Sequence, residues 1–257
     1  MNMTKIAYSI KQGQTHIFDN TPCQDVIVKY ISETNSTLAL CDGAGSCDNS
    51  EIVAKVTAQF ACEYISNNFE GIYESETKND SYRLNHQFLH KLYDYWNHKK
   101  IPITERSCTL LAVAIHNDGR WISMHIGDGG IFIQNDISTR LESIPENGMF
   151  PNVTFFLSDY DADEHIYWSK GFFVSNGGFL LTSDGCFDLL GDPVNEEIAD
   201  AVEYMFNWIK EYDEESVSKA IESNLTEIFS NHSADDLSIG IIWYSGTSDT
   251  NTYKVLS

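Results

Sequence analysis

Residues 38–51 read LALCDGAGSCDNSE and pass from an apolar run, through one carboxylate, into a glycine-containing turn. The carboxylate is Asp42, and a helical pattern begins shortly after the turn. A strand, a glycine turn and a helix in this order can cradle a phosphate on backbone amides. An aspartate at the opening of such a cradle would repel phosphate. Asp42 is therefore expected either to cap the turn or to hold a metal ion that binds the phosphate.

The composition is that of a folded globular protein with a strongly acidic charge balance. The chain has 257 residues, of which 42% are hydrophobic, and a formal net charge of -22 from 16 basic and 38 acidic residues. Nucleic-acid binding depends on Lys and Arg that neutralise phosphates, so this balance argues against a nucleic-acid partner. The same field attracts divalent cations.

The chain carries no signal for export or for a membrane. Its first residues, MNMTKIAYSIKQGQ, lack the apolar core of a signal peptide. The longest apolar run, residues 110–115, is far shorter than the ~20 residues of a membrane-spanning helix. The six cysteines form no CxxC pair and no zinc-binding spacing, and we interpret them as buried, reduced thiols. We therefore expect a cytoplasmic protein without membrane contact.

Apolar periodicity predicts both strands and helices. Strands are expected at 4–9, 25–31, 36–42, 108–116, 120–126, 130–134, 178–183 and 237–244. Helices are expected at 50–67, 82–97, 195–211 and 214–229, the first with a capping box formed by Asp48 and Glu51. Asn117, Asp118 and Gly119 predict a hairpin turn. Helix pairs among hairpin strands favour an α+β layered fold over a regular βαβ alternation.

We expect residues 1–257 to form a single domain. There is no internal repeat and no low-complexity tract. The stretch at about 143–176 is the least regular, and we interpret it as a long excursion over one end of the core.

Aspartates fall at the ends of several predicted strands. Asp42 and Asp184 each end an apolar run and precede a glycine, Asp25 begins a strand, and Asp235 with Asp236 precedes the last strand. Taken singly, each is explained more simply as a turn residue. Carboxylates gathered at one rim of a sheet repel one another and need a cation, and oxygen-only ligand sets suit Mg²⁺ or Mn²⁺. Together they predict a metal site.

These residues carry a resemblance to a known family. The segments LALCDGAGS, SCTLLAVAI, ISMHIGDGG, LLTSDGCFD and ADDLSIGII resemble, in order and spacing, the motifs of the metal-dependent serine/threonine protein phosphatases of type 2C. The opening HIFDNTPCQD is similar to a bacterial subgroup of that family. The resemblance implies a four-layer α-β-β-α sandwich, in which two central antiparallel sheets are flanked by helix pairs and a two-metal site lies at one end.

The resemblance also implies roles for individual residues. Asp42 would bridge two metals, with the Gly43 carbonyl on one of them, and Asp184 and Asp235 would complete the first metal site. On this resemblance, these three aspartates would form the catalytic set. Gln24 and Asp25 stand where the family has the acidic pair of the second metal.

A third, weaker metal site and one structural turn are also implied. Asp188 matches a carboxylate of the third site, whose other member would be Thr104 or Glu105. Gly127, Asp128 and Gly129 match a turn that is structural in the family, and a hairpin turn is our interpretation of Asp128.

The function that the resemblance implies is hydrolysis of phosphoserine and phosphothreonine in proteins. The reaction would depend on Mg²⁺ or Mn²⁺, use a metal-bridging water, and form no covalent enzyme intermediate. The partners implied are a phosphorylated protein and a cognate Ser/Thr kinase, and we expect a monomer. A two-metal nuclease is disfavoured by the net charge.

Three departures from the family leave an alternative open. Ala44 stands where animal members have a histidine acid, and Gln24 replaces a carboxylate. The arginine that grips phosphate in the family is absent; Asn20 stands near its place, and His16 lies close enough in sequence to supply a donor. The alternative is a weakly active or inactive phosphatase-like module that binds a phosphoprotein or another partner through the same cleft.

Overall fold

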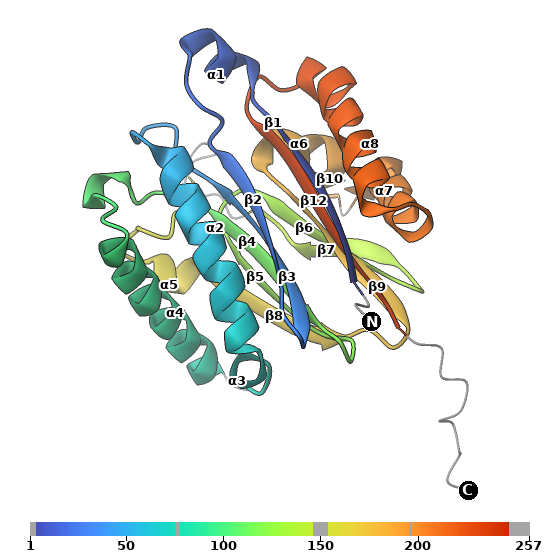
Figure 1. Cartoon of the computed structure of the whole chain (residues 1–257), viewed down its shortest axis with the longest axis horizontal. Coiled ribbons are helices and arrows are strands. Elements are labelled where there is room, and N and C mark those ends of the chain that lie inside the picture. The colour runs from blue at the N-terminus through green and yellow to red at the C-terminus, as the bar shows by residue number, and fades with distance from the viewer. Residues whose placement is uncertain (1–3, 76–77, 146–153, 196, 247–257) are drawn as a thin grey trace, which may run out of the picture.

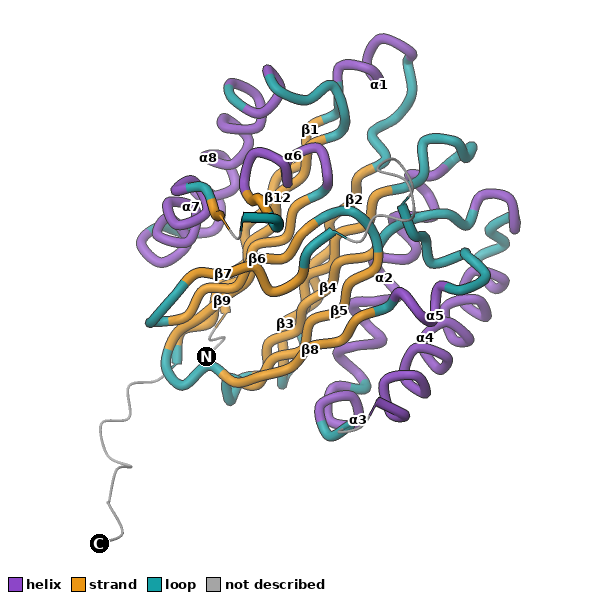
Figure 2. The backbone as a smooth tube through the Cα atoms, turned by 180° about the vertical axis from the view of Figure 1, so that it is seen from behind, coloured by secondary structure: helices purple, strands orange, loops and turns teal. Residues whose placement is uncertain are grey.

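The computed structural model describes residues 4–75, 78–145, 154–195 and 197–246, which form two stacked β-sheets with helices on both outer faces. Figure 1 shows α2, α3, α4 and α5 over one sheet and α6, α7 and α8 over the other; Figure 2 shows the same layers from behind. This arrangement confirms the predicted α-β-β-α sandwich.

The first sheet has the strand order β1-β12-β9-β6-β7, and every neighbouring pair is antiparallel. Its strands are β1 (Thr4–Lys11), β6 (Gly130–Asn135), β7 (Thr139–Ser143), β9 (Asn176–Thr182) and β12 (Leu237–Ser245). The last described strand thus pairs with the first.

The second sheet has the order β2-β3-β4-β5-β8 and is also antiparallel throughout. Its strands are β2 (Asp25–Ile31), β3 (Asn35–Asp42), β4 (Leu110–His116), β5 (Arg120–Ile126) and β8 (Tyr167–Phe172). The predicted hairpin between β4 and β5 is confirmed, and Gly119 takes the left-handed backbone conformation (φ 95°) that its turn requires.

The helices cover these sheets and connect them. The elements over the second sheet are α2 (Ser50–Asn67), α3 (Phe69–Tyr73), α4 (Lys78–His98) and α5 (Ala162–His165). Those over the first sheet are α6 (Asp184–Leu190), α7 (Asp200–Glu211) and α8 (Glu214–Glu227). A short helix, α1 (Gln14–Asp19), joins β1 to β2. Smaller elements are η1 (Ile103–Glu105), η2 (Phe229–Asn231), β10 (Gly191–Asp192) and β11 (Glu197–Ile198).

Strand β3 shows how the sequence produces these layers. Successive side chains of a strand point to opposite faces of the sheet. Leu38 and Leu40 accordingly join the apolar cluster between the two sheets, whereas Ala39 and Cys41 join the cluster beneath α2 and α4. A third cluster packs α7 and α8 on the first sheet. A strand buried on both faces reads as a continuous apolar run, which explains why LALC precedes the carboxylate.

The structure corrects several details of the sequence prediction. The N-cap of α2 is Asn49 in a left-handed conformation (φ 55°) with no side-chain capping bond, so the predicted capping box of Asp48 and Glu51 is wrong. The third predicted helix begins at Asp200, because β11 takes part of the segment assigned to it. Strands β7 and β8 were not predicted, because their residues lie at sheet edges and are only partly buried. Part of the expected excursion at 143–176 lies outside the described residues.

Two further expectations concern the membrane and the thiols. None of the described helices combines the length and apolarity that crossing a bilayer requires. All six cysteines are free, and four of them are buried.

Candidate metal centre

Asp42 is the last residue of a central strand, and its backbone is held on both sides by Thr109. The Asp42 amide donates to Thr109 Oγ1 at 3.0 Å, and the Thr109 amide donates to the Asp42 carbonyl at 2.9 Å. Gly127 packs on the same threonine: a Cβ built there would lie 2.5 Å from Thr109 Cγ2, and its φ is +121°. A glycine is required at 127 for both reasons. These contacts fix the backbone from which the Asp42 carboxylate projects.

Asp25 lies directly opposite Asp42 in the pairing of β2 with β3. Directly opposed side chains share one face of a sheet, and like charges in such a pair are destabilising. Asp25 is only 4% exposed, and the partners of its carboxylate are the neutral hydroxyls of Ser183 and Ser238. A buried carboxylate without a cationic partner is costly, so this pair calls for a positively charged ligand.

Asp184 reaches the same place from the first sheet. Strand β9 ends at Thr182, Ser183 is the N-cap of α6, and Asp184 begins that helix. The Gly185 amide donates to Asp184 Oδ1 at 2.7 Å. The Ser183 amide donates to the Ser238 carbonyl at 3.2 Å, which ties this turn to β12. Asp184 is therefore held at the end of a central strand, as Asp42 is.

Asp128 is a member of the site that the sequence analysis missed. The interpretation of 127–129 as a hairpin turn is wrong, because β5 and β6 do not pair: β5 belongs to the second sheet and β6 to the first. The segment instead crosses between the sheets at the end where Asp42 and Asp184 lie. The Thr154 hydroxyl donates to Asp128 Oδ2. Spacing along the chain did not reveal the crossing, since a hairpin and a crossing both use Gly-Asp-Gly.

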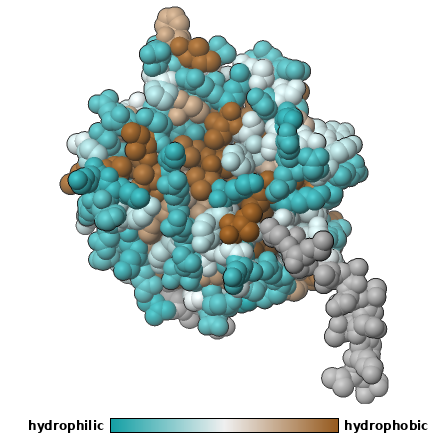
Figure 3. Space-filling model, in the orientation of Figure 1, coloured by the Kyte–Doolittle hydropathy of each residue, from teal (hydrophilic) through white to brown (hydrophobic). Residues whose placement is uncertain are grey.

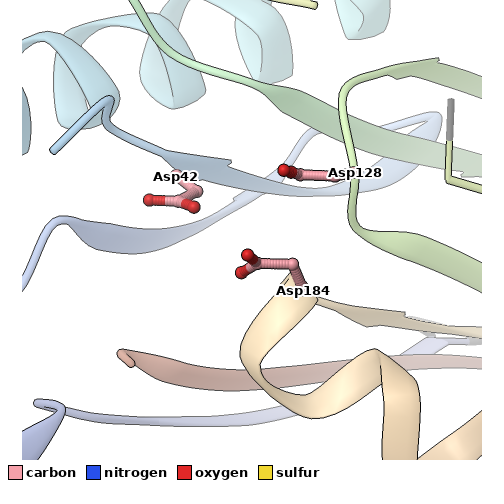
Figure 4. Close-up of side chains that lie close together, drawn as sticks. All are labelled: Asp42, Asp128 and Asp184. Carbon is pink, nitrogen blue, oxygen red and sulfur yellow. The ribbon is translucent and has the colours of Figure 1, made fainter. Parts of the chain in front are cut away.

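Asp42, Asp128 and Asp184 converge on one space from three separate segments (Figure 4). One carboxylate oxygen of each lies within 4.8 Å of the others. No other group of three or more such acidic, His or Cys ligands gathers this closely in the described ranges. All donor atoms are carboxylate oxygens, the ligand type that hard divalent cations prefer.

The electrostatics of the cluster agree with this geometry. Burial, reinforced by the charges of Asp25, Asp184 and Asp128, raises the pKa of Asp42 well above its usual range. Burial and the charges of Asp128 and Asp235 raise the pKa of Asp184 to about 7. Burial likewise raises the pKa of Asp25 to about 8 and raises that of Asp128. Without a cation these carboxylates resist ionisation, and a divalent ion would reverse that cost.

A cleft of about 410 Å³ opens beside the cluster. Asp128 and Asp184 line it, together with two other predicted site residues, Asp188 and Asp235, both of them exposed. The Asp235 charge contributes to the raised pKa of all three clustered aspartates. The structure therefore places Asp188 and Asp235 on the rim of the same site rather than within the closest set.

Comparison with known proteins identifies the family. The sequence profile of the family described as Protein phosphatase 2C matches residues 12–226. The chain belongs to this family.

Individual relatives agree with this assignment. Serine/threonine-protein phosphatase 3 of Escherichia coli (strain K12) is 28% identical over 165 residues, which are 62% of this chain and 64% of that protein, so less than two thirds of the relative is matched. Serine/threonine phosphatase Stp1 from Staphylococcus aureus has a similar structure, with a TM-score of 0.63 at 13% identity over 95% of this chain and 96% of that one. RsbX, solved in complex with magnesium, gives a TM-score of 0.55 at 12% identity over 94% and 96%. At these identities the two structures show a shared fold.

Asp236, the neighbour of Asp235, has a different role from the other aspartates. It is 2% exposed and accepts hydrogen bonds from the amides of Gly13 (2.7 Å) and Gln24 (2.6 Å). His16 Nδ1 lies 2.9 Å from its Oδ2. Asp236 thus joins the start of α1 to the start of β2, and His16 contacts it rather than facing an open phosphate site.

The structure also places three other residues that the resemblance singled out. Gln24 is buried, and the Gly43 amide donates to its carbonyl at 3.2 Å. Ala44 is buried, and its amide donates to the Ser107 carbonyl at 3.0 Å. Glu105 accepts a bond from the Asn49 side chain at 3.3 Å and does not join the carboxylate cluster; Thr104 precedes it in η1.

The described residues do not supply a replacement for the arginine that is missing from the family pattern. No Lys or Arg lines the cleft among the described residues, and His232 is its basic side chain. Arg106 donates to the Ile101 carbonyl, and Arg120 contacts Glu70 and Asp118 at the other end of the fold. Asn20, which stands near the family's arginine in sequence, is the exposed, left-handed C-cap of α1 (φ 57°).

Proposed function

We propose that this protein hydrolyses phosphoserine and phosphothreonine in proteins with the help of bound Mg²⁺ or Mn²⁺. The observation that carries the proposal is the convergence of Asp42, Asp128 and Asp184, one oxygen of each within 4.8 Å of the others, at the edge of an open cleft. The family assignment and the partial match to a serine/threonine-protein phosphatase support the substrate class.

The residues present fit a divalent cation. The donors are carboxylates, Asp25 is buried with only neutral hydroxyls as partners, and Asp25 faces Asp42 directly. We propose that Asp42 serves two ions, with Asp184, Asp235 and the Gly43 carbonyl on the first. Asp25 and Gln24 would serve the second ion, Asp128 would adjoin the pair, and Asp188 would serve a weaker third. The magnesium in the RsbX structure supports this choice of metal.

Divalent ions held there would supply a nucleophilic water at neutral pH and would offset the charge of the phosphoryl oxygens. The chain itself does the positioning. Thr109 and Gly127 fix Asp42, and the N-terminal turn of α6 fixes Asp184. Rigid ligands of this kind hold reacting groups in line at no further cost in entropy. Ala44 offers no proton to the leaving oxygen, so we expect solvent in the cleft to supply it.

The charge of the cleft also determines how a phosphate group can bind. Its described lining combines four aspartates (Asp128, Asp184, Asp188 and Asp235) with one histidine, so a phosphate dianion would be repelled unless cations are present. Substrate binding should therefore depend on metal as strongly as turnover does. A phosphorylated protein remains the proposed partner, with a cognate Ser/Thr kinase, and the monomer remains an expectation.

A second candidate function is supported by specific absences at the cleft. Gln24 removes one negative charge from the proposed second metal, and no Lys or Arg of the described chain lines the cleft. A weakly active or inactive module that binds phosphoproteins through this cleft would have these features. It would bind a phosphopeptide in a metal-dependent way without releasing phosphate.

One experiment separates the two functions. Phosphate release from a phosphothreonine peptide is followed with Mn²⁺, after addition of chelator, and after thiol alkylation, with Asp42→Asn as the matched control. We expect release that requires Mn²⁺, survives alkylation and is lost in Asp42→Asn. Binding without release would support the second candidate. Release that survives the chelator but not alkylation would contradict both.

A further inference from the structure

Helix α1 exposes two large apolar side chains beside the candidate metal centre. Phe18 is 89% exposed and Ile17 is 51% exposed, and none of the six residues of α1 is buried. The tip of the molecule at the position of α1 is apolar in the space-filling view (Figure 3). These two side chains make no contribution to the core, and together they offer an apolar surface that a ligand could cover.

This helix is fastened to the cleft rather than free of it. The Thr15 amide donates to the Ala234 carbonyl at 3.0 Å, and the Gly13 amide donates to Asp236 at 2.7 Å. A Cβ built on Gly13 would lie 2.3 Å from the Asp235 carbonyl carbon, so the two backbones are in close contact. Asp235 lines the cleft. The apolar tip of α1 is therefore held at a fixed position relative to the candidate site.

We propose that α1 is a docking site for the segment of a phosphoprotein substrate that flanks the phosphorylated residue, with Phe18 and Ile17 contacting a large apolar side chain of that segment. The inference rests on the proposed phosphatase function and names a feature of its substrates.

The distance between Phe18 and the cleft follows from backbone geometry. The path from Asp235 through Ala234 and Thr15 to Phe18 is at most roughly 14 Å. An extended peptide rises ~3.3 Å per residue, so the contacting side chain should lie about four or five positions from the phosphorylated residue.

The size and charge of this surface favour a peptide over a second copy of the chain. Two side chains bury at most a few hundred Å², whereas a stable protein interface needs about 800 Å² from each partner. Asp19 follows Phe18 in the chain, and Asp188 and Asp235 line the cleft; these carboxylates, within a chain of net charge -22, favour a peptide that also carries Lys. A basic phosphopeptide with one apolar residue has this chemistry.

The test uses the full chain and synthetic phosphothreonine peptides of Gly, Ser and Lys, in which one Leu is moved through the positions two to six residues on either side. In the wild type, Leu at one position should raise kcat/KM about fivefold to tenfold, mainly through KM, as expected for partial burial of one Leu. Phe18→Ala should lose that gain and Phe18→Leu should keep most of it. Ile137→Ala is the matched control, since Ile137 is 92% exposed in the turn between β6 and β7 at the far end.

Two further readouts keep the outcomes distinct. Hydrolysis of a small aryl phosphate should be the same in all four proteins, and a loss in Phe18→Ala alone would overturn docking in favour of an effect on the site. Docking would also be overturned if kcat/KM of the wild type did not depend on the position of Leu, or if Phe18→Ala kept the same dependence. A wild-type dimer in sedimentation that Phe18→Ala dissociates would overturn it as well. If none of the four proteins releases phosphate, the proposed function fails. Docking is then tested by the affinity for the labelled Leu peptide, measured by fluorescence anisotropy. A lower affinity in Phe18→Ala alone supports docking, and equal affinities in all four proteins overturn it.

Discussion

The two ends of the sandwich place acidic side chains in opposite surroundings. At the end where β3 stops, Asp25, Asp42 and Asp184 face one another, and burial raises the pKa of each. At the other end, Arg120 lies 2.6 Å from Glu70 and 2.8 Å from Asp118. Hydrogen bonds from Arg120 hold the pKa of Glu70 below its usual value, and the pKa of Asp118 is lowered by bonds to Arg120 and His116 that outweigh its burial.

This difference shows which end is complete without a ligand. The chain neutralises the acids of the Glu70 end with its own cations, whereas no Lys or Arg among the described residues lines the cleft at the Asp42 end. Buried carboxylates of one sign are a stability cost that a fold retains when something outside the chain offsets it. The Asp42 end is therefore the one suited to divalent cations. Substitutions at either end test this difference.

The largest effect is expected from Asp42→Ala. This residue lies opposite Asp25 and converges with Asp128 and Asp184, so its loss removes the oxygen common to the proposed metal pair. Turnover should fall by at least about 1000-fold, the equivalent of roughly 4 kcal/mol of transition-state stabilisation. Steady-state hydrolysis of an aryl phosphate at saturating Mn²⁺ measures it. Near wild-type turnover in a folded variant would remove the assignment.

Asp128→Asn is expected to have the next largest effect. The substitution keeps the shape of the crossing between the sheets but removes a carboxylate from the cluster. The Mn²⁺ concentration for half-maximal activity should rise by about tenfold to 100-fold, as for residues that adjoin a metal. A metal titration of both proteins checks this. A variant that changed only in thermal stability would return Asp128 to a purely structural role.

The stability of the metal-free protein should fall as pH rises. The folded pKa values of Asp184 and Asp25, about 7 and about 8, lie above the ordinary value of 3.8, so the folded chain binds these protons more tightly than the unfolded chain. Their contribution to stability is full below about pH 4 and is lost as pH rises through 7 and 8.

Thermal unfolding in chelator measures this effect. The Tm should be roughly 5 °C lower at pH 8 than at pH 5.5, and saturating Mn²⁺ should remove most of the difference. Glu70 and Asp118 serve as an internal contrast: their lowered pKa values make their contribution disappear only at acid pH, below that window. A metal-free Tm that rises from pH 5.5 to 8 would contradict the raised pKa values.

Arg120→Ala should have the smallest effect and should leave the metal centre unchanged. The guanidinium bonds two largely exposed carboxylates and lies over Tyr73, and such surface contacts contribute about 1 kcal/mol or less. Chemical denaturation should show this small loss, and the Mn²⁺ titration should match the wild type. A changed metal requirement would mean that the two ends are coupled.

Much of the fold could be predicted from local pattern. The strands at 25–31 and 120–126 and the helix at 50–67 were placed at their observed bounds, because buried strands and amphipathic helices carry a strong apolar period. Edge strand β8 was missed, since a half-exposed edge lacks that period. The start of α2 was also misjudged: Asp48 fits a capping box in sequence, but the chain enters the helix through a left-handed Asn49.

The site could be predicted less fully than the fold. Asp42 and Asp184, which meet in the carboxylate cluster, could be predicted because Asp42 ends one buried strand and Asp184 closely follows another. Asp128 was not, because only the sheet assignment of β5 and β6 distinguishes a crossing from a hairpin. The difference between Asp235, which faces the cleft, and Asp236, which bonds Gly13 and Gln24, also depends on contacts between distant segments.

The central claim is that the Asp42 end binds divalent cations and the Glu70 end does not. Isothermal titration of Mn²⁺ into chelator-treated protein at pH 7 tests it most directly, with Asp42→Asn and Arg120→Ala titrated alongside. We predict saturable binding by the wild type and Arg120→Ala, accompanied by proton release because ions displace protons from carboxylates of raised pKa. Asp42→Asn should lose most of this binding. Wild-type protein that takes up no Mn²⁺, or Asp42→Asn that binds it as the wild type does, would contradict the account.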